Sequence, residues 1–480
     1  MTSARFVAVD LGATSGRVML ADIGPGSLKL RSLHRFSNDP VYLWNGERTA
    51  MHWDLPGLFA QVCTGLAEAQ RAADDVASVG VDSWAVDYGL LRGGALLGLP
   101  HNYRDARCAF GADAVHATLT QERIFARNGL QFLNFNTMFQ LAADRAAGLL
   151  DLADAALLVP DLIGYWLTGR SATERTNAST TGLLGIDGQW DHELETMLGL
   201  PGLFPQLTEP GTDLGTVLPD LAARAGLRDG LKVTTVASHD TASAVVAVPM
   251  RAESAAYVSC GTWALVGVEL DRPIVDEAAR TANFTNEVGA DGRIRFLRNV
   301  MGLWVLSETV RHWERDGSRV DLPLLLEQAA ACPPMDVFDA DDPRFIEPGD
   351  VPDRIRGWYA EHGLRAPESR PEMARAIVES LAAGFARGVE QAAALSGVPV
   401  DTVHLVGGGA RNRLLCQLVA DRMGRPVVAG PVEATAIGNV LIQARAHGVL
   451  SGDLDQLRGT MATALPTERF SPQRTPAGRA

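Results

Sequence analysis

The sequence predicts a mixed α/β protein of two large domains, and three observations support this fold class. The chain has 480 residues, which is too long for one ordinary core and fits two or three domains of about 150 residues each. Apolar strand-like runs alternate with amphipathic helical stretches, as in mixed α/β sheets. An order of strand, Gly/Thr turn and strand occurs near the N-terminus and again after the middle of the chain. This recurrence indicates two similar halves, on element order alone.

The first half opens with an antiparallel meander. Residues 5–24 form an apolar run, a turn rich in Gly, Thr and Ser, and a second apolar run, and residues 28–36 continue as a third strand. An amphipathic helix is predicted over residues 55–72. It is followed by residues 76–91, where a short buried strand ends in acidic and aromatic residues. We expect these strands and the helix to form one mixed sheet layer.

The second half begins in the same way. Residues 255–270 have the order strand, Gly-Thr turn, strand, and residues 403–423 have the order strand, glycine turn, helix. We therefore expect an N-terminal domain at 1–246 and a C-terminal domain at 247–465. The segment 466–480 is rich in Pro and Arg without apolar periodicity, and it is predicted to be a flexible tail.

Composition excludes several classes of partner. Hydrophobic residues make up 46% of the chain and charged residues 21%, which is ordinary for a soluble globular protein. The net charge of −14 would repel a polyanion, and no Lys/Arg-rich run offers a local footprint for nucleic acid or anionic lipid. A phosphate bound by this protein must therefore be held by backbone amides and a metal ion. We expect no nucleic-acid and no membrane partner.

The cysteines and the N-terminus indicate a reduced, cytoplasmic protein. The five cysteines show no CxxC spacing, so neither a zinc site nor a disulfide framework is expected. The N-terminal residues lack the apolar stretch and cleavage site of a signal peptide. No segment reaches 18 uninterrupted apolar residues. The sequence does not distinguish a monomer from a homodimer.

The first motif with chemical potential is DLGATSGR at residues 10–17, between the first two predicted strands. Its glycines let the backbone approach a ligand, its hydroxyls and amides can donate to phosphate oxygens, and Asp10 at the strand end can hold Mg²⁺. The alternative is an ordinary hairpin turn with an exposed acid.

Two further motifs fit a nucleotide. Gly261-Thr262-Trp263 occupies the matching turn of the second half, where it could contact the terminal phosphate. Gly407-Gly408-Gly409 ends a strand before a helix, and it leaves a flat surface for adenine or ribose beside a helix N-terminus. The alternatives are a turn beside a core Trp and a plain strand-to-helix loop.

A fourth motif, SHDTASA, contains the residue with the strongest catalytic potential. Asp240 lies after an apolar strand and at the head of a predicted helix, near the junction of the two halves. A carboxylate there suits a base that accepts the proton of a sugar hydroxyl during phosphoryl transfer. Asp is also a common helix N-cap, and this alternative remains open.

A fifth motif offers groups that recognise sugars. Asp82, Trp84 and Asp87 follow a buried strand, and HNYRD lies downstream at 101–105. Carboxylates and amides bind sugar hydroxyls, and an aromatic face packs on sugar C–H surface. The alternative is a solvated loop.

These motifs together carry a family resemblance. They are VAVDLGATSGRVML, VDSWAVDYGLL, YRDARC, GLQFLNFNTMFQL, ASHDTASAV, YVSCGTW, NVMGLW, LVGGGARN and AGPVEATAIGN. In this order they resemble the FGGY carbohydrate kinases, from about residue 6 to about residue 445. SHDTASA together with FNT, TNA, TNE and NVMGLW is similar to the branch of the family that acts on L-rhamnulose.

The resemblance implies two ribonuclease-H-like, actin-like ATPase domains with a catalytic cleft between them. It implies Asp240 as the catalytic base, Asp10 as the residue that orients Mg²⁺, and ATP and Mg²⁺ as cofactors. The residues implied at the nucleotide are Ala13, Thr14, Ser15, Gly16, Arg17, Thr262, Ser307 and Gly408. The residues implied at the sugar are Asp82, Trp84, Ala85, His239, Asp240, Thr241 and Asn299.

The sequence departs from the family pattern at two of these positions. Ala85 stands where a glycine that touches substrate is expected, so its methyl group could narrow the sugar pocket. Ser307 stands where a nucleotide-side glutamine is expected, so that contact is shortened or lost.

The function implied is an ATP-dependent kinase that phosphorylates the 1-hydroxyl of L-rhamnulose in L-rhamnose catabolism. Two alternatives stay open at this point. One is a kinase of another ketose, such as L-fuculose or L-xylulose, which Ala85 suggests. The other is a sugar or nucleotide sensor that keeps the fold without transferring phosphate, although retention of Asp10, Thr262 and Asp240 together argues against it.

Overall fold

The fold is that of a computed structural model, which describes residues 3–315 and 317–473. The chain forms two compact units. The first unit contains the residues up to Pro249 together with Leu270–Phe296 and Ala434–Leu465, and the second contains Met250–Glu269, Leu297–Glu433 and the residues from Pro466. The mixed α/β character predicted from the sequence is confirmed in both units. Among the described residues, the helices are all too short or too polar to cross a membrane.

The first unit is built on a six-stranded mixed sheet. Its strands, in spatial order, are β12 (Asp213–Thr216), β13 (Lys232–Thr234), β6 (Val76–Ser83), β1 (Ala4–Leu11), β2 (Ser15–Gly24) and β3 (Ser27–Ser37). The predicted meander is confirmed, because β1, β2 and β3 pair in antiparallel order. β6 runs parallel to β1. The carboxyl ends of β1 and β6 therefore meet at one edge of the sheet, which brings Asp10 and Asp82 together.

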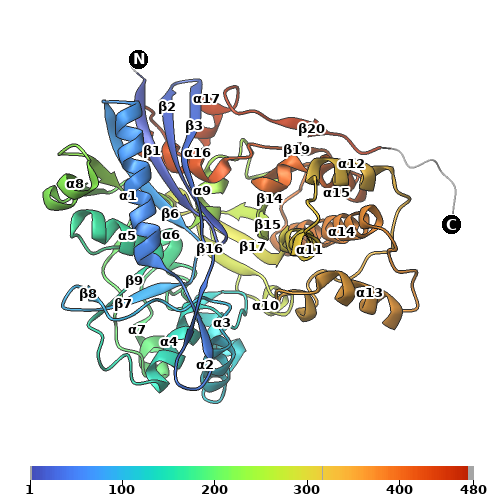
Figure 1. The fold of residues 1–480 in the computed structure, drawn as a ribbon, viewed down its shortest axis with the longest axis horizontal. Coiled ribbons are helices and arrows are strands. Elements are labelled where there is room, and N and C mark those ends of the chain that lie inside the picture. The colour runs from blue at the N-terminus through green and yellow to red at the C-terminus, as the bar shows by residue number, and fades with distance from the viewer. Residues whose placement is uncertain (1–2, 316, 474–480) are drawn as a thin grey trace. The chain divides into compact units, whose positions relative to one another are not determined.

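Two helices cover the meander, as Figure 1 shows. Helix α1 (Leu55–Ala72) has the predicted bounds, since Asp54 caps its first turn and Pro56 stands at its start. Its Gly65 lets the helix approach β2, because a Cβ there would lie 2.4 Å from the Val18 side chain. Helix α16 (Ala434–Ala446) contacts β1 and β6, and its buried Gln443 donates to the Val7 carbonyl.

Shorter elements complete the first unit. The remaining strands are β4 (Val41–Trp44), β5 (Thr49–His52), β7 (Tyr88–Arg92), β8 (Ala95–Leu96), β9 (Ala155–Leu158), β10 (Thr173–Glu174), β11 (Leu207–Thr208) and β16 (Thr285–Val288). The remaining α-helices are α2 (Arg107–His116), α3 (Gln121–Asn128), α4 (Thr137–Ala146), α5 (Val159–Thr168), α6 (Arg175–Ala178), α7 (His192–Leu198), α8 (Pro219–Ala225), α9 (Asp240–Val246), α10 (Glu277–Thr281) and α17 (Leu454–Met461). A 3₁₀ turn, η1, spans Ala290–Gly292.

The second unit has a sheet whose strands follow the order β17 (Ile294–Met301), β15 (Trp263–Leu270), β14 (Ala255–Cys260), β18 (Thr402–Val406), β19 (Val427–Ala429) and β20 (Glu468–Phe470). β14 and β15 pair in antiparallel order and β18 is parallel to β14. This topology confirms the predicted hairpin and the predicted strand, glycine turn and helix.

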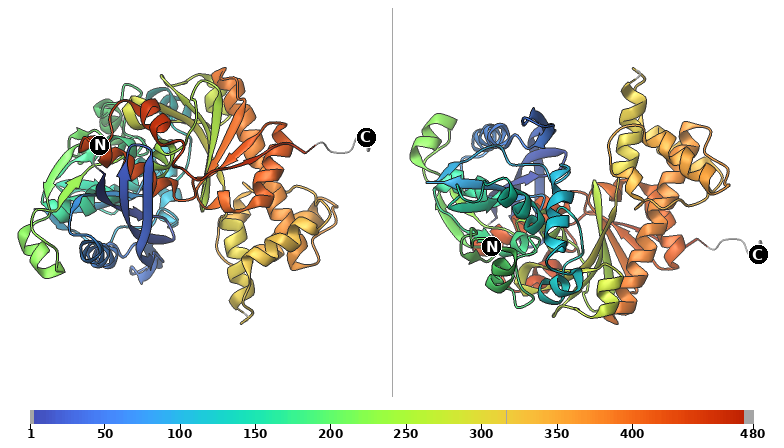
Figure 2. Two further views of the ribbon diagram at one scale, coloured as in Figure 1. Left: turned by 90° about the horizontal axis from the view of Figure 1, so that it is seen from above. Right: turned by 90° about the horizontal axis from the view of Figure 1, so that it is seen from below.

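Helices pack against this second sheet. They are α11 (Trp304–Arg315), α12 (Leu322–Ala331), α13 (Val351–Glu361), α14 (Arg370–Ser396) and α15 (Arg413–Met423), with 3₁₀ turns η2 (Pro343–Phe345) and η3 (Gly408–Arg411). The 27-residue helix α14 contacts β14, and α15 contacts β19. Figure 2 shows these two helices beside one another along the sheet.

The C-terminal segment differs from the prediction. Three residues of the expected tail 466–480 form β20, which pairs with β19 through Val427 and Phe470. Phe470 is buried, and the Arg413 guanidinium lies 5.3 Å from its ring centroid. One apolar side chain among polar residues gives no periodicity, so this edge strand could not be predicted from the sequence pattern. Residues 474–480 of the expected tail lie outside the described residues.

The units are assembled from discontinuous segments. The first passage from one unit to the other falls between Pro249 and Met250, three residues after the boundary expected at 246. Leu270–Phe296 and Ala434–Leu465 then pack with the first unit although they lie in the second half of the chain. The expected domains 1–246 and 247–465 stay a prediction.

Candidate active site

Asp240 stands at the start of helix α9 with its carboxylate accessible. The N-cap of this helix is His239, and Asp240 is the first helical residue. The N-cap role considered for Asp240 is therefore filled by its neighbour. The side chain of Asp240 is 29% exposed, and its Oδ1 accepts a hydrogen bond from Thr241 Oγ1 at 3.1 Å. Burial raises the pKa of Asp240 above the usual value, which strengthens it as a proton acceptor.

The loop that presents Asp240 is held by its neighbours. Ser238 donates to Glu174 Oε2 from both its backbone nitrogen, at 2.9 Å, and its hydroxyl, at 2.7 Å. The backbone nitrogen of Ser83 donates to the Ser238 carbonyl at 2.9 Å, and His239 N donates to Thr176 Oγ1. Because these bonds fix the backbone just before Asp240 and helix α9 begins at Asp240, the direction of its side chain is preset.

Glu174 is a residue that sequence reasoning missed. It is fully buried and accepts hydrogen bonds from Thr176, Asn177 and Ser238. Burial raises its pKa, against the lowering effect of these donors. An acid two residues before the TNA motif was the available signal, but its partner Ser238 is 64 residues away along the chain.

Asp10 and Asp82 form an acidic pair at the ends of β1 and β6, where they are register partners. Asp82 is fully buried, and its Oδ2 accepts a hydrogen bond from Asn439 Nδ2 at 2.6 Å. Burial, followed by the charge of Asp10, raises the pKa of Asp82 well above its usual range, and Asp240 adds to this effect. Three of the predicted site carboxylates, Asp10, Asp82 and Asp240, are therefore close enough to interact electrostatically.

The acidic pair fits a divalent cation. Asp82 Oδ1 is buried and receives no hydrogen bond from the described residues, so one carboxylate oxygen is available as a ligand. Mg²⁺ commonly takes one or two protein carboxylates and completes its shell with water and phosphate oxygens. Across the described residues, no cluster of three or more acidic, His or Cys side chains forms a complete metal cage. The pair therefore suits a cation that arrives with a nucleotide.

The turn at residues 12–16 is pinned from outside. Gly12 N donates to Ser15 O at 3.0 Å, and Asn38 donates from its backbone to Thr14 O and from its side chain to Gly12 O. Ala13, Thr14 and Ser15 are partly exposed. Their backbone amides stand beside the acidic pair, because the turn joins β1 to β2.

Gly16 and the next residue, Arg17, both have structural partners. Arg17 Nη2 lies 2.8 Å from Asp10 Oδ2, so the arginine expected at the phosphates forms an ion pair with the expected metal ligand. Gly16 lies against the Phe36 ring, and a Cβ there would come within 2.2 Å of it. Close packing therefore requires this glycine.

The loop after β6 differs from the expectation for Trp84. The indole is 4% exposed, lies 4.3 Å from the Trp53 ring, and donates to Asp87 Oδ2 at 3.0 Å. Its rings face the core, because the buried Asp87 also binds Trp53 and Gln140. Trp84 therefore packs in the core beside the loop, and its expected place beside the sugar stays a prediction.

The next residues of this loop make a strained turn. Asp87 N donates to the Ala85 carbonyl at 2.9 Å, and the central residue, Val86, has φ 68°. A β-branched residue rarely adopts this conformation, so the turn is held by its surroundings. The Val86 carbonyl accepts from Thr137 Oγ1 at 2.6 Å. Ala85 is partly exposed at this turn.

The downstream HNYRD segment serves the fold. Asp105 accepts from the backbone of Met51 and from the Arg48 guanidinium. Burial raises the pKa of Asp105, but Arg48 and the backbone donors outweigh burial and lower it to about 2. Tyr103 packs on Trp53. These contacts tie 101–105 to the β4–β5 hairpin.

The predicted nucleotide residues of the second unit gather around Cys260. The turn at 261–263 packs against Gly302, where a Cβ would come within 2.7 Å of the Thr262 carbonyl. Gly407 has φ 79° and Gly409 packs on the Cys260 side chain, so both glycines have structural causes. Gly408 has neither constraint and is exposed. A Cβ at Gly408 would meet only ordinary van der Waals contacts, so its expected place at the nucleotide stays a prediction.

Ser307 and Asn299 complete the predicted set. Ser307 is the fourth residue of α11 and is exposed. Its backbone nitrogen donates to Leu303 O at 2.8 Å. Asn299 is half-buried on β17. Leu303 also lies 3.8 Å from the Cβ position of Gly408, so Ser307, Thr262 and Gly408 share one region of the second unit.

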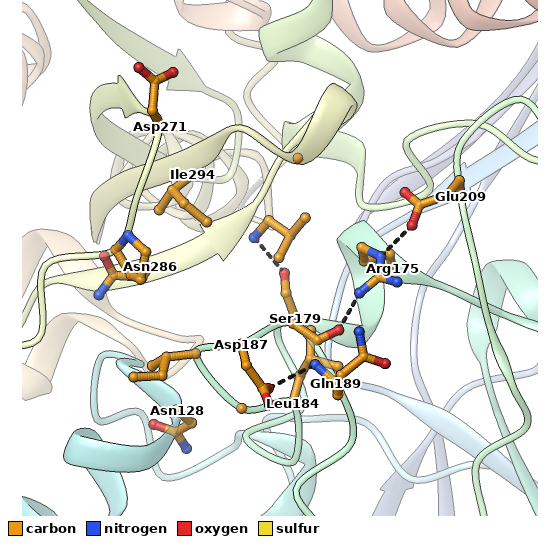
Figure 3. A pocket seen from close by; sticks show the side chains of 16 residues that line it. Asn128, Arg175, Ser179, Leu184, Asp187, Gln189, Glu209, Asp271, Asn286 and Ile294 are labelled. Carbon is orange, nitrogen blue, oxygen red and sulfur yellow. Dashed lines mark hydrogen bonds and ion pairs between the residues drawn. The ribbon is translucent and has the colours of Figure 1, made fainter.

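A separate cavity of about 390 Å³ lies in the first unit. Figure 3 shows Arg175 bound to Glu209 on one side of it and Asn286 and Ile294 on the other. No residue predicted to contact sugar or nucleotide lines it. The Ser179 hydroxyl in its wall accepts a hydrogen bond from Val288 N at 2.9 Å.

Comparisons with known proteins identify the class. The N-terminal domain of the FGGY family of carbohydrate kinases matches residues 6–247, and the C-terminal domain matches residues 256–447. The chain therefore belongs to the FGGY family of carbohydrate kinases, and it is a sugar phosphotransferase. The predicted family and the predicted two-domain fold are confirmed.

Individual relatives refine the comparison. The chain is 42% identical to a rhamnulokinase of Pectobacterium carotovorum subsp. carotovorum, over 98% of this chain and 94% of that protein. It is 38% identical to a rhamnulokinase of Bacteroides thetaiotaomicron, over 98% of this chain and 96% of that protein. Among solved structures, a ligand-bound xylulose kinase from Lactobacillus acidophilus has a TM-score of 0.77 at 18% identity, over 98% and 94% of the two chains.

Proposed function

We propose that this protein transfers the γ-phosphate of ATP to the 1-hydroxyl of L-rhamnulose, which gives L-rhamnulose 1-phosphate and ADP. The observation that carries the proposal is the similarity to rhamnulokinases at 42% and 38% identity along nearly the whole chain. Two of the motifs that suggested an L-rhamnulose substrate from the sequence, TNA and TNE, contact His239 beside Asp240 through Thr176 and Glu287.

Asp240 is the proposed general base. Its carboxylate accepts the proton of the 1-hydroxyl while the sugar oxygen forms a bond to the γ-phosphorus, and the bond between that phosphorus and the bridging oxygen of ADP breaks. A partly exposed carboxylate with a pKa raised by burial suits this proton transfer. Thr241 and His239 flank it and are proposed sugar contacts.

The proposed phosphate contacts come from backbone groups and a cation. Ala13, Thr14, Ser15 and Gly16 offer the amides of the pinned turn, and Thr262 and Gly408 are the proposed contacts from the second unit. Mg²⁺, held by Asp10 with Asp82 beside it, would neutralise charge on the phosphate oxygens when bound. The protein itself orients the carboxylates that receive the cation, through β1–β6 pairing and Asn439.

Substrate choice is proposed to depend on the loop of Ala85. Ala85 is partly exposed at the strained turn between Trp84 and Val86, and we propose that its methyl group touches the sugar. We also propose that Asn299 contacts the sugar and that Ser307 makes a shortened nucleotide contact. The proposed setting is the cytoplasm, where ATP is available, and either a monomer or a homodimer is compatible with the site.

A substrate panel tests the function. Purified protein is assayed by coupled ADP detection with L-rhamnulose, L-fuculose, L-xylulose and glycerol in parallel, with ATP and Mg²⁺ at fixed concentrations. We expect the highest kcat/KM with L-rhamnulose. A higher kcat/KM with another ketose would overturn the substrate, and ATP turnover that no sugar stimulates would overturn the kinase assignment.

A further inference from the structure

A buried ion pair lies directly behind the residue that precedes Asp240. Glu287 on β16 and Arg295 on β17 are 5% and 0% exposed, and Arg295 Nη2 lies 3.0 Å from Glu287 Oε2. The guanidinium also donates from Nε and Nη2 to the Val288 carbonyl. Burying this ion pair costs free energy, because two charges must leave water. Its contacts therefore need an explanation.

The ion pair contacts one nitrogen of His239. Arg295 Nη2 lies 3.1 Å from His239 Nδ1, and Glu287 Oε2 lies 3.3 Å from the same nitrogen. Of these two contacts, the one from Arg295 has hydrogen-bond geometry. The other ring nitrogen, Nε2, lies 3.5 Å from Asp240 Oδ1. The imidazole therefore connects the buried pair with the proposed base.

The chemistry of the guanidinium decides which nitrogen carries the proton. Arginine has only donors and stays charged, so a nitrogen that bonds to it must accept. His239 Nδ1 accepts with its lone pair, which excludes a proton there and opposes an imidazolium beside a cation. A neutral imidazole that accepts at Nδ1 must carry its proton on Nε2.

We infer that Arg295, held in place by Glu287, fixes His239 as the neutral tautomer with its proton on Nε2. The Nε2–H then points toward the carboxylate of Asp240 and toward any sugar hydroxyl bound beside it. With the opposite tautomer, the Nε2 lone pair would face the carboxylate oxygens and repel them. Glu287 and Arg295 are thus positioning residues for the reaction, and this inference rests on the proposed role of Asp240.

The groups around His239 support this arrangement. The charged groups that face it are Asp240 from α9, Glu287 from β16 and Arg295 from β17. Burial raises the pKa of Glu287, but Arg295 and His239 together outweigh burial and lower it. The carboxylate therefore stays ionised and keeps the guanidinium in place. The backbone nitrogen of His239 donates to Thr176 Oγ1, so the backbone of His239 is held independently of its ring.

The cavity in Figure 3 touches the same network. Val288 lines the cavity, and its carbonyl receives the two bonds from Arg295. Ser179, which also lines the cavity, accepts a bond from Val288 N. The ion pair is therefore anchored through the β16 backbone and not only through side chains.

A spectroscopic experiment tests the tautomer without reference to activity. The full-length protein is labelled with ¹⁵N in its ten histidines, and the resonance of His239 is assigned by its loss in His239→Gln. We expect nitrogen shifts and couplings of an unprotonated Nδ1 and a protonated Nε2 at neutral pH. A proton on Nδ1 in the wild-type protein would overturn the inference, whatever sugar the protein phosphorylates.

Variants test whether Arg295 causes the tautomer. Arg295→Met should move the His239 proton wholly or partly to Nδ1, where Glu287 can accept it, and should lower kcat about 10–100-fold with the KM for ATP unchanged. Arg295→Lys keeps a donor and should restore the Nε2–H signature at least in part. The control is Arg458→Met, another buried arginine of the first unit that donates to a backbone carbonyl, Val245 O.

The outcomes separate cleanly. An Nε2–H tautomer that persists in folded Arg295→Met would overturn the positioning role. An equal fall in kcat in Arg458→Met would mean that loss of any buried arginine has this effect, and it would also overturn that role. If Arg295→Met does not fold, the wild-type spectrum and the spectrum of Arg295→Lys still show whether His239 carries its proton on Nε2. Failure of the substrate panel leaves the tautomer result unaffected, so the two proposals can fail separately.

Discussion

Asp10 and Asp82 are register partners on the neighbouring parallel strands β1 and β6, and the charge of Asp10 helps to raise the pKa of the buried Asp82. Two carboxylates held together away from water repel each other, so a cation between them removes a cost that the fold already carries. The pair therefore favours a cation at this edge of the sheet, and a cation bound there would attract phosphate oxygens.

The acidic pair predicts a dependence on divalent cations. Excess EDTA should abolish sugar-dependent ADP formation, and added Mg²⁺ should restore it. Asp10→Asn should raise the Mg²⁺ concentration for half-maximal rate by about tenfold or more, because one carboxylate of the pair is lost. A Mg²⁺ titration of initial rates measures this.

Asp22→Asn is the matched control for that titration, since Asp22 lies on β2 of the same sheet but at its surface, in an ion pair with Arg5. Its Mg²⁺ titration should coincide with that of the wild type. A titration of Asp10→Asn that also coincides with the wild type would remove the acidic pair from cation binding.

The strained turn at Val86 predicts an effect on sugar binding. Thr137→Val removes the hydroxyl that binds the Val86 carbonyl, which should lower the free energy of unfolding by about 1 kcal/mol. The turn that carries Ala85 should loosen, so the KM for sugar should rise severalfold while the KM for ATP stays constant. Urea unfolding and initial-rate kinetics check both effects.

Thr168→Val serves as control, because Thr168 is a buried residue of α5 whose hydroxyl also donates to a backbone carbonyl, Gly164 O. It should cost similar stability without a change in either KM. If Thr137→Val and Thr168→Val behave alike in kinetics, the turn at Val86 does not position the sugar.

Ala85 predicts a change in sugar preference. Ala85→Gly removes the methyl group from the loop and should relax the preference for L-rhamnulose over L-fuculose by about tenfold in kcat/KM, since one carbon in a pocket has effects of this order. Competition between the two ketoses measures the ratio directly. An unchanged ratio would show that the methyl group does not contact the sugar.

Asp87 predicts a pH dependence of stability. Burial raises its pKa from 3.8 to about 6, against the lowering effect of Gln140, Trp53 and Trp84. Between pH 4 and 6 the folded protein therefore binds more protons at this site than the unfolded chain. The contribution of Asp87 to the free energy of unfolding is present at about pH 4. It is lost as the pH rises through 6, and the total loss is about 3 kcal/mol.

Asp87→Asn should remove this contribution. The variant should therefore be more destabilised relative to wild type at pH 4 than at pH 7, as measured by urea unfolding at both values. Asp113→Asn, an exposed carboxylate on α2, is the control. A difference between wild type and Asp87→Asn that does not vary with pH would contradict the raised pKa of Asp87.

Local signals in the sequence predicted much of the fold. The bounds of α1 were predicted correctly because Asp54, Pro56 and apolar periodicity agree at its start. The hairpins at 10–17 and 255–270 were predicted by their turn residues. The strand β20 was missed, because its fit depends on Phe470 meeting β19, about 40 residues earlier in the chain.

The site was only partly predictable, for a similar reason. Asp10, Asp82 and Asp240 stand in motifs whose composition points to chemistry, but their mutual approach depends on strand pairing. Glu174 contacts Ser238, and Glu287 and Arg295 contact His239, across long stretches of sequence, so even the TNE motif that contains Glu287 did not reveal its role. The packing of Trp84 on Trp53 could not be predicted, because an aromatic residue beside acids fits a core position as well as a place beside the sugar.

The role of Asp240 as the base is the centre of this account, and Asp240→Asn tests it most directly. The amide keeps the shape of the side chain but cannot accept the hydroxyl proton, so kcat with L-rhamnulose should fall about 10²–10⁴-fold. The affinity for ATP, measured by calorimetry on the same preparation, should stay within about threefold of wild type. A variant that turns over L-rhamnulose at a near-normal rate would contradict the account.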